Sequence, residues 1–147
     1  MLIRNILEES VRKFDEVKAV KWLKKKEIME RSYGELMENV VSTRKGLLAE
    51  GFEGKHIALI GTSSVEWMES YLGIITGCTT AVPLDAALPC EDLIDLLNRS
   101  DSVALFLSPK LKPYLDAFLE NCPKLQKVWM LQEEVEDAPA KVYGIGE

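Results

Sequence analysis

The stretch that decides the fold covers residues 56–84 and reads HIALIGTSSVEWMESYLGIITGCTTAVPL. It opens with His56–Ile60, a short apolar run typical of a strand covered on both faces. From Trp67 to Ile75 the apolar residues then recur at helical spacing, and Thr80–Leu84 forms a second strand-like run. A strand, a helix and a strand in this order predict a βαβ unit with parallel strands.

The same alternation continues on both sides of this unit. Downstream, helical patterns and apolar runs alternate as far as residue 131, and upstream an amphipathic helix precedes two short strands joined by Lys24–Glu27. The patterns predict helices over residues 6–14, 34–50, 63–77, around 93–97 and over 109–119, and strands over 17–23, 28–33, 56–60, 80–84, 103–107 and 127–131. The expected fold class is α/β, a layered and mostly parallel sheet with helices on both faces, preceded by an N-terminal helix and a β-hairpin.

Several helix ends carry recognisable capping residues. Ser32 and Glu35 have the spacing of a capping box, and Ser63 with Glu66 repeats it. Gly51 stands where a helix favours a left-handed C-terminal residue, and Ser108 followed by proline is typical of a helix N-terminus. These signals predict where three helices begin and where one ends.

The chain is predicted to form one folded unit followed by a short tail. Its 147 residues are 47% hydrophobic, which suits a single domain. Residues 1–131 are expected to form an N-terminal subdomain. Residues 132–147 begin with an acidic, aperiodic run and are expected to be an acidic linker or the start of the next segment.

Charge and composition exclude several function classes. The formal net charge is −6, which argues against binding to nucleic acid or to anionic lipid surfaces. Cys78, Cys90 and Cys122 lack the spacing of a zinc site and are expected to be buried, reduced thiols. No secretion signal is visible at the N-terminus, and the longest apolar stretch, residues 71–81, is too short and too mixed to span a membrane. The expected location is therefore the cytoplasm.

Ligands of parallel sheets bind at the carboxyl ends of the strands, so the turn Gly61–Ser64 is the best candidate site. It offers hydroxyls and free N–H groups at a helix N-terminus, which are the minimum for an anion. It lacks the glycine pattern of a dinucleotide site and the lysine of a Walker loop, and helix capping is therefore the favoured interpretation. His56, the only histidine, is expected to be satisfied locally or to face solvent, because no acid or nucleophile accompanies it.

The remaining candidates are assigned structural roles. Trp22, Trp67 and Trp129 stand at apolar-patterned positions, which favours packing in the core or between helix and sheet. The acidic pairs Glu8-Glu9, Glu91-Asp92 and Glu133-Glu134 are expected to be solvated faces or first-turn charges of helices. No residue is assigned a catalytic, cofactor-binding or metal-binding role.

Several short motifs together resemble the opening of the AMP-forming, adenylate-forming synthetases. The resemblance spans residues 5–131, and the order and spacing of its motifs make it more specific than any one of them. The matching residues are Ser32-Tyr33-Gly34-Glu35-Leu36, Gly46-Leu47-Leu48, Gly51, His56 to Gly61, Ser64-Val65-Glu66-Trp67, Gly77, Ala81 to Asp85 and Pro89. Within the family the chain is most similar to long-chain fatty acyl-CoA synthetases.

The resemblance implies an N-terminal portion of a ligase. In that family ATP and a carboxylate give an acyl-adenylate and pyrophosphate, and CoA then displaces AMP, so ATP, magnesium and CoA are implied for the full-length enzyme. The 147 residues lack the family's phosphate loop, its nucleotide and magnesium motifs and its C-terminal lid, and Thr62-Ser63 stands where many relatives have Asn-Ser. The expectation is a scaffold that is inactive alone and whose partner is the remainder of a synthetase chain, with a fatty acid as substrate.

Two alternatives stay open beside the ligase hypothesis. A stand-alone, non-catalytic α/β binding or interaction module belongs to a different class, and it is favoured if the gene ends at Glu147. A receiver-like regulator is less well supported, because Gly61-Thr62-Ser63 is not the acidic cluster that a receiver needs. If the chain is a truncation, an exposed sheet edge and apolar faces also predict self-association.

Overall fold

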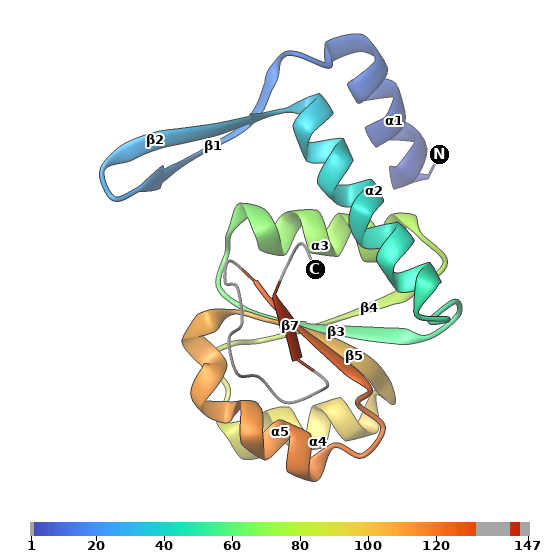
Figure 1. The fold of residues 1–147 in the computed structure, drawn as a ribbon, viewed down its shortest axis with the longest axis vertical. Coiled ribbons are helices and arrows are strands. Elements are labelled where there is room, and N and C mark those ends of the chain that lie inside the picture. The colour runs from blue at the N-terminus through green and yellow to red at the C-terminus, as the bar shows by residue number, and fades with distance from the viewer. Residues whose placement is uncertain (1, 132–141, 145–147) are drawn as a thin grey trace.

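A computed structural model describes residues 2–131 and 142–144 of the chain (Figure 1). The helices are α1 (Ile3–Phe14), α2 (Tyr33–Ala49), α3 (Val65–Thr76), α4 (Cys90–Arg99), the 3-10 helix η1 (Pro109–Tyr114) and α5 (Leu115–Asn121). The strands are β1 (Lys18–Lys24), β2 (Glu27–Ser32), β3 (His56–Ile60), β4 (Thr80–Leu84), β5 (Ser102–Leu107), β6 (Lys127–Met130) and β7 (Val142–Gly144). The expected α/β class is confirmed.

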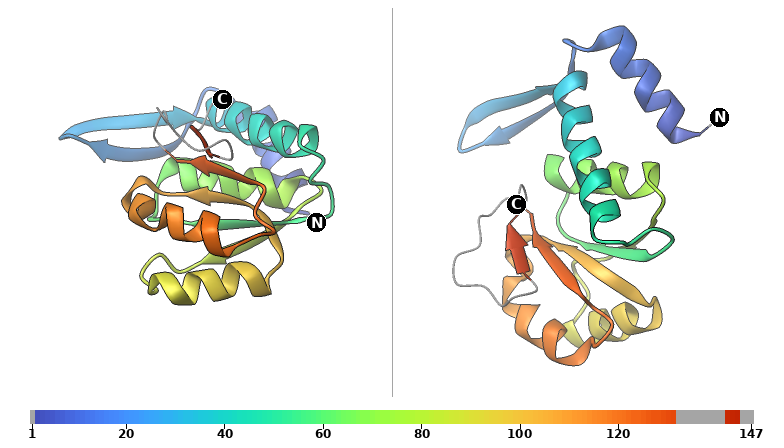
Figure 2. Two further views of the ribbon diagram at one scale, coloured as in Figure 1. Left: turned by 60° about the horizontal axis from the view of Figure 1, so that its bottom comes forward. Right: turned by 45° about the vertical axis from the view of Figure 1, so that its right-hand side comes forward.

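The central sheet contains five parallel strands in the order β4-β3-β5-β6-β7. Helix α3 lies on one face with α2 beyond it, and α4 and α5 cover the other face (Figures 1 and 2). The sequence placed 132–147 in a linker or a following segment, and β7 within this range pairs with β6. The acidic run 132–137 lies outside the described residues.

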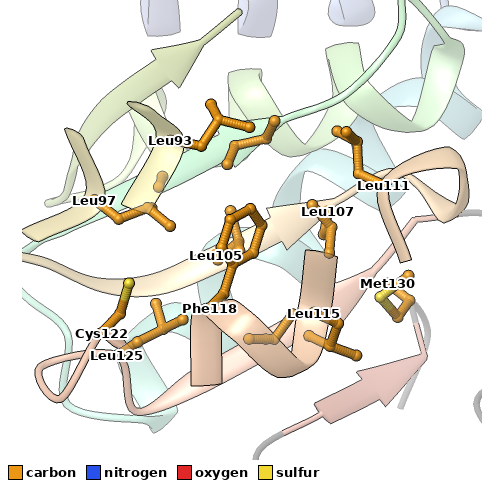
Figure 3. Close-up of a cluster of buried hydrophobic side chains, with 13 residues drawn as sticks. Leu93, Leu97, Leu105, Leu107, Leu111, Leu115, Phe118, Cys122, Leu125 and Met130 are labelled. Carbon is orange, nitrogen blue, oxygen red and sulfur yellow. The ribbon is translucent and has the colours of Figure 1, made fainter. Parts of the chain in front are cut away.

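The two faces of the sheet bury two separate apolar clusters because side chains alternate along each strand. On β3, Ala58 and Ile60 face the cluster under α4 and α5, which is shown in Figure 3, while Ile57 and Leu59 face α3. All four side chains are fully buried. This two-sided burial explains why the strand reads as a continuous apolar run instead of an alternating one.

The N-terminal elements stand apart from this sheet. Strands β1 and β2 form a separate antiparallel hairpin that projects from the body, and α1 lies beside α2 (Figures 1 and 2). Helix α2 approaches α3 closely at Gly73, where an added Cβ atom would lie 2.5 Å from Cβ of Thr43. Glycine at this position therefore sets the distance between the two helices.

One predicted helix is divided in the structure. The pattern from Ser108 to Leu119 predicts a single helix, but the chain forms η1 and then α5. Pro113 lies inside η1 and cannot donate a helical hydrogen bond, so a regular α-helix is not continuous from residue 109 to residue 119. The side chain of Ser108 makes no capping hydrogen bond there.

No helix among residues 2–131 combines the length and the apolar composition needed to cross a bilayer.

Candidate functional site

The strand order places a topological switch point between β3 and β5. From β3 the chain crosses through α3 to β4 on one side, whereas from β5 it crosses through η1 and α5 to β6 on the other. Ligands of open parallel sheets bind where the connections diverge in this way, beyond the carboxyl ends of the strands. The turn Gly61–Ser64 after β3 and Ser108 after β5 flank this point.

The two flanks are joined directly across the switch point. The hydroxyl of Ser108, which is 2% exposed, accepts a hydrogen bond from the backbone N–H of Thr62 at 3.2 Å. The backbone N–H of Ser108 donates to the carbonyl of Ile60 at 2.9 Å. A Cβ atom at Gly61 would lie 2.1 Å from the Ser108 oxygen, so only glycine permits this contact.

Helix capping is what the structure shows for the remainder of the turn. The Ser64 hydroxyl accepts from the backbone N–H of Trp67 at 3.1 Å, and Ser64 is the N-cap of α3. The predicted capping box on Ser63 and Glu66 is therefore wrong by one residue, since the third helical position holds Trp67, which has no carboxylate to return the bond. By contrast, the box formed by Ser32 and Glu35 is present in full at α2.

The polar groups found at this edge are bonded within the chain. No group of three or more histidine, cysteine, aspartate or glutamate side chains within residues 2–131 is placed to hold a metal. The Thr62 N–H already bonds Ser108, and the carboxylate of Asp85, after β4, accepts from the N–H of Ala87 at 2.9 Å. The edge is a small-residue wall with hydroxyl groups.

His56 lies at the opposite, amino-terminal edge of the sheet. Its side chain is exposed, and Nδ1 lies 2.7 Å from the carbonyl oxygen of Ser100, so it is both locally bonded and open to solvent. It lines a surface depression of about 470 Å³ with Lys55 and with the ion pair formed by Asp101 and Lys124. This pairing lowers the pKa of Asp101.

The aromatic expectations are met at two of three positions. Trp129 is 9% exposed and stacks on Phe106 at 4.9 Å between ring centroids, and Trp67 stacks on Tyr71 at 5.2 Å. Trp22 is not in the core, because it lies on the projecting hairpin, where the Arg31 guanidinium lies 5.5 Å from its ring centroid.

The cysteine and acidic expectations are confirmed in part. All three thiols are free, but only Cys122 is buried, and Cys78 is exposed in the turn before β4. Burial raises the pKa of the Cys122 thiol. Glu8 and Glu9 form surface ion pairs along α1, Glu91 and Asp92 occupy the first turn of α4, and Glu133-Glu134 lies outside the described residues.

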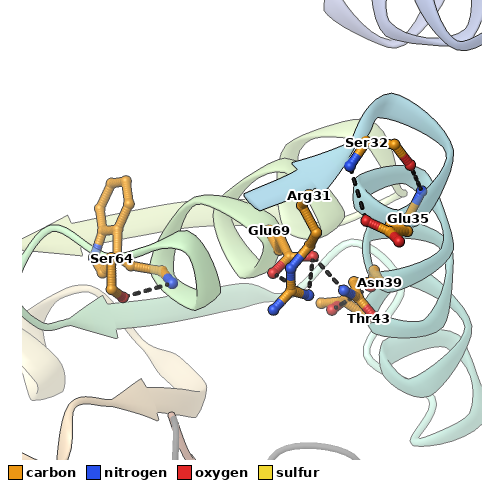
Figure 4. Close-up of polar contacts among 8 residues, drawn as sticks. Arg31, Ser32, Glu35, Asn39, Thr43, Ser64 and Glu69 are labelled. Carbon is orange, nitrogen blue, oxygen red and sulfur yellow. Dashed lines mark hydrogen bonds and ion pairs between the residues drawn. The ribbon is translucent and has the colours of Figure 1, made fainter. Parts of the chain in front are cut away.

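Sequence reasoning missed Glu69 on α3, which is 3% exposed and is the most buried charged group among the described residues. Its carboxylate accepts from the Arg31 guanidinium on β2 at 3.0 Å and from the Asn39 amide on α2 at 2.5 Å (Figure 4). The three side chains join the hairpin to both helices. The available signal was helical spacing, since Glu69 precedes the buried Gly73 and Thr76 by four and seven residues.

Burial dominates the electrostatics of this cluster. Desolvation raises the pKa of Glu69, while the hydrogen bond from Asn39 and the charge of Arg31 lower it again and Glu66 adds a smaller upward shift. The net direction is upward, so the pairing does not fully offset the cost of burying the charge. The cluster joins β2, α2 and α3, and Figure 4 shows it away from Ser64 at the switch point.

Solved structures with the same fold are larger than this chain. The coronafacic acid ligase from Pectobacterium brasiliense is similar with a TM-score of 0.88 at 19% identity, covering 98% of this chain and 28% of that one. The anthranilate CoA ligase AuaEII in complex with anthranoyl-AMP is similar with a TM-score of 0.78 at 18% sequence identity, and the match covers 88% of this chain and 25% of that one. The N-terminal domain of FACL13 from Mycobacterium tuberculosis is similar with a TM-score of 0.79 at 18% sequence identity, and the match covers 88% of this chain and 34% of that one.

These likenesses show the fold, and in each case this chain spans no more than about a third of the compared one. No curated protein matches the sequence. A match to the family described as AMP-binding enzyme covers residues 7–144, which is nearly the whole chain. The chain therefore belongs to the AMP-binding enzyme family.

Proposed function

We propose that the chain is the N-terminal structural portion of an ATP-dependent acyl-CoA synthetase. The reaction of such an enzyme joins a carboxylate to AMP with release of pyrophosphate, and the thiol of CoA then displaces AMP to give the acyl-CoA. The observation that carries the proposal is the family match over residues 7–144. The motif pattern from Ser32 to Pro89, which resembles fatty acyl-CoA synthetases, supports a fatty acid as the carboxylate.

In this proposal the chain is a scaffold. Strands β3 and β5 with the turn Gly61–Ser64 would form one wall of the cleft, and the bond from Thr62 to Ser108 would hold that wall rigid. Stabilising the transition state at the α-phosphate requires clustered donors and a metal ion, and no metal-holding group of three or more His, Cys, Asp or Glu side chains occurs among the described residues. The 147 residues alone are therefore expected not to catalyse adenylation.

Exchange of labelled pyrophosphate into ATP tests both parts of the proposal. The 147-residue chain should show no exchange with fatty acids or with aromatic acids. A protein that continues through the downstream coding sequence should show exchange with fatty acids and should form AMP only when a carboxylate is present. Exchange by the 147-residue chain itself would contradict the scaffold role.

The coding sequence after Glu147 separates the proposal from its main alternative. A Gly- and Ser/Thr-rich loop ending in lysine, found shortly downstream, would support the synthetase. A stop codon there would contradict it and would favour a non-catalytic binding module. If the loop is present but the longer protein forms no AMP with any acid, the reaction class is wrong while the family assignment stands.

A further inference from the structure

The hairpin concentrates positive charge in an otherwise acidic protein. Residues 18–32 contain six basic and two acidic side chains, for a net charge of +4, whereas the whole chain carries −6. Three of the lysines, Lys24, Lys25 and Lys26, are consecutive and form the tip: Lys24 ends β1, and Lys25 with Lys26 makes the turn to β2. The net charge of the whole chain led to the expectation that it does not bind anionic lipid. That net charge conceals the local excess of positive charge in the hairpin.

Within the part of the chain that the structure describes, the tip lysines form no ion pair, unlike the other basic residues of the hairpin. Lys18 and Lys21 lie 3.7 and 3.9 Å from Glu30, and Arg31 is paired with Glu69. Among the ion pairs within residues 2–131, none involves Lys24, Lys25 or Lys26. Their charges are thus available to a partner.

Two large apolar side chains accompany the lysines. Leu23 and Ile28 are directly opposite each other across the hairpin, so they share one face of it. They are 73% and 71% exposed, the highest values for large apolar side chains among the described residues. An aliphatic pair held in water beside a basic turn has no evident use in the fold itself.

The two lysines of the turn, Lys25 and Lys26, have a strained backbone conformation. Lys25 and Lys26 have φ angles of 48° and 69°, and both are left-handed. A two-residue hairpin turn of this geometry favours Asn-Gly, because a side chain is strained at positive φ. The sequence therefore holds charge where a neutral pair would fold with less strain.

From these four observations we infer that the hairpin tip binds the surface of an anionic lipid bilayer. Lys24, Lys25 and Lys26 contact the headgroups, and Leu23 with Ile28 enters the boundary of the acyl chains. An acidic protein surface or a nucleic acid would attract the lysines but offers less to the aliphatic pair. This inference does not depend on the proposed ligase activity.

The acidic body does not oppose such binding. The seven residues of β1 span about 20 Å, and the hairpin extends away from the sheet (Figures 1 and 2). Charges in water are screened over about 8 Å at physiological ionic strength. The tip is therefore electrostatically separate from most of the remaining charge.

Co-sedimentation with vesicles tests the inference. The 147-residue chain should bind vesicles of phosphatidylglycerol and phosphatidylcholine in equal parts, and should not bind phosphatidylcholine alone. The double variant Lys25→Asn/Lys26→Gly relaxes the turn while removing two charges, so its thermal stability should be equal or higher. Its partitioning should fall by roughly 30-fold, from the attraction expected for two lysines.

Two further variants make the test specific. Lys45→Gln/Lys110→Gln removes two exposed lysines elsewhere and should change partitioning far less. Leu23→Thr/Ile28→Thr retains all charges and β-propensity and should weaken binding to the anionic vesicles. Equal binding by the wild type and the Lys25→Asn/Lys26→Gly variant would overturn the inference. So would unchanged binding of the threonine variant together with equally strong capture by polyglutamate, which would indicate an acidic protein partner.

Discussion

At the scale of single residues, the contact between Gly61 and Ser108 has the tightest steric limit at the switch point. Both residues follow neighbouring parallel strands, and the Ser108 hydroxyl occupies the space that a side chain at position 61 would need. Trp67 limits the same space, because its Cδ1 atom would lie 3.3 Å from a Cβ atom at position 61. Glycine at 61 is thus explained by packing without any ligand.

Replacing Gly61 by alanine should destabilise the chain by about 1–3 kcal/mol, because the new methyl group overlaps the Ser108 oxygen. Urea unfolding monitored by circular dichroism measures the loss. In a Ser108→Ala background the same change should cost less, since the overlapping atom is gone. Gly46→Ala is the matched control: no atom lies within 4 Å of the added carbon, and it should stabilise α2 by about 0.5–1 kcal/mol. Additive losses at 61 and 108 would contradict the steric explanation.

At the scale of elements, the cluster of Arg31, Asn39 and Glu69 decides how the hairpin is attached. Strand β2, helix α2 and helix α3 each contribute one side chain. Hydrophobic packing of the hairpin is limited, because β2 buries only Ser32 and β1 has no fully buried residue. The polar cluster therefore carries much of the orientation of the hairpin relative to the sheet.

The pH dependence of stability should report the state of Glu69. Its pKa is raised in the folded chain above the ordinary value of 4.5, so the folded state holds this proton more tightly than the unfolded state. The resulting stabilisation is complete below the unfolded pKa and is lost as pH rises through the folded pKa. Compared with Glu69→Gln, the wild type should therefore gain free energy of unfolding as pH falls from neutral to about 4.5. Urea titrations of both proteins at several pH values measure the difference, and a difference that is flat or falls toward acid would contradict it.

At the scale of the whole molecule, apolar surface remains outside both clusters. Helix α1 has no buried residue, and Ile3 and Ile6 on it are about half exposed. Strand β4 is at the edge of the sheet and pairs only with β3 among the described strands. Exposed apolar surface and a free edge both favour association between molecules.

We therefore expect the 147-residue chain to self-associate as its concentration rises. Sedimentation velocity should show a growing weight-average sedimentation coefficient. Ile3→Ser/Ile6→Ser should reduce it, whereas Asn5→Ser/Arg12→Ser, at exposed polar positions of the same helix, should leave it unchanged. A monomer at every concentration would contradict the expectation. If both double variants behave like the wild type while the chain associates, the contact lies elsewhere, with the edge of β4 as the next candidate.

Local sequence by itself determined the element order and the fold class. Strand β3 is readable because both of its faces are buried, and α2 is readable because a capping box precedes its apolar stripe. The family resemblance also depends on such local motifs. These features depend on residues only a few positions apart, so they can be recognised in the sequence without knowing the fold.

Only the tertiary structure decided the strand order, the contact of Ser108 with Thr62 and the burial of Glu69. Ser108 lies 46 residues from Thr62 in the chain, and Glu69 lies 38 residues from Arg31. No periodicity of the sequence encodes a pair at such a separation. The same holds for Trp22, whose apolar pattern suggested the core but whose hairpin never joins the sheet. Periodicity shows which side of an element is apolar, and the distant residues that cover that side are selected when the whole chain packs.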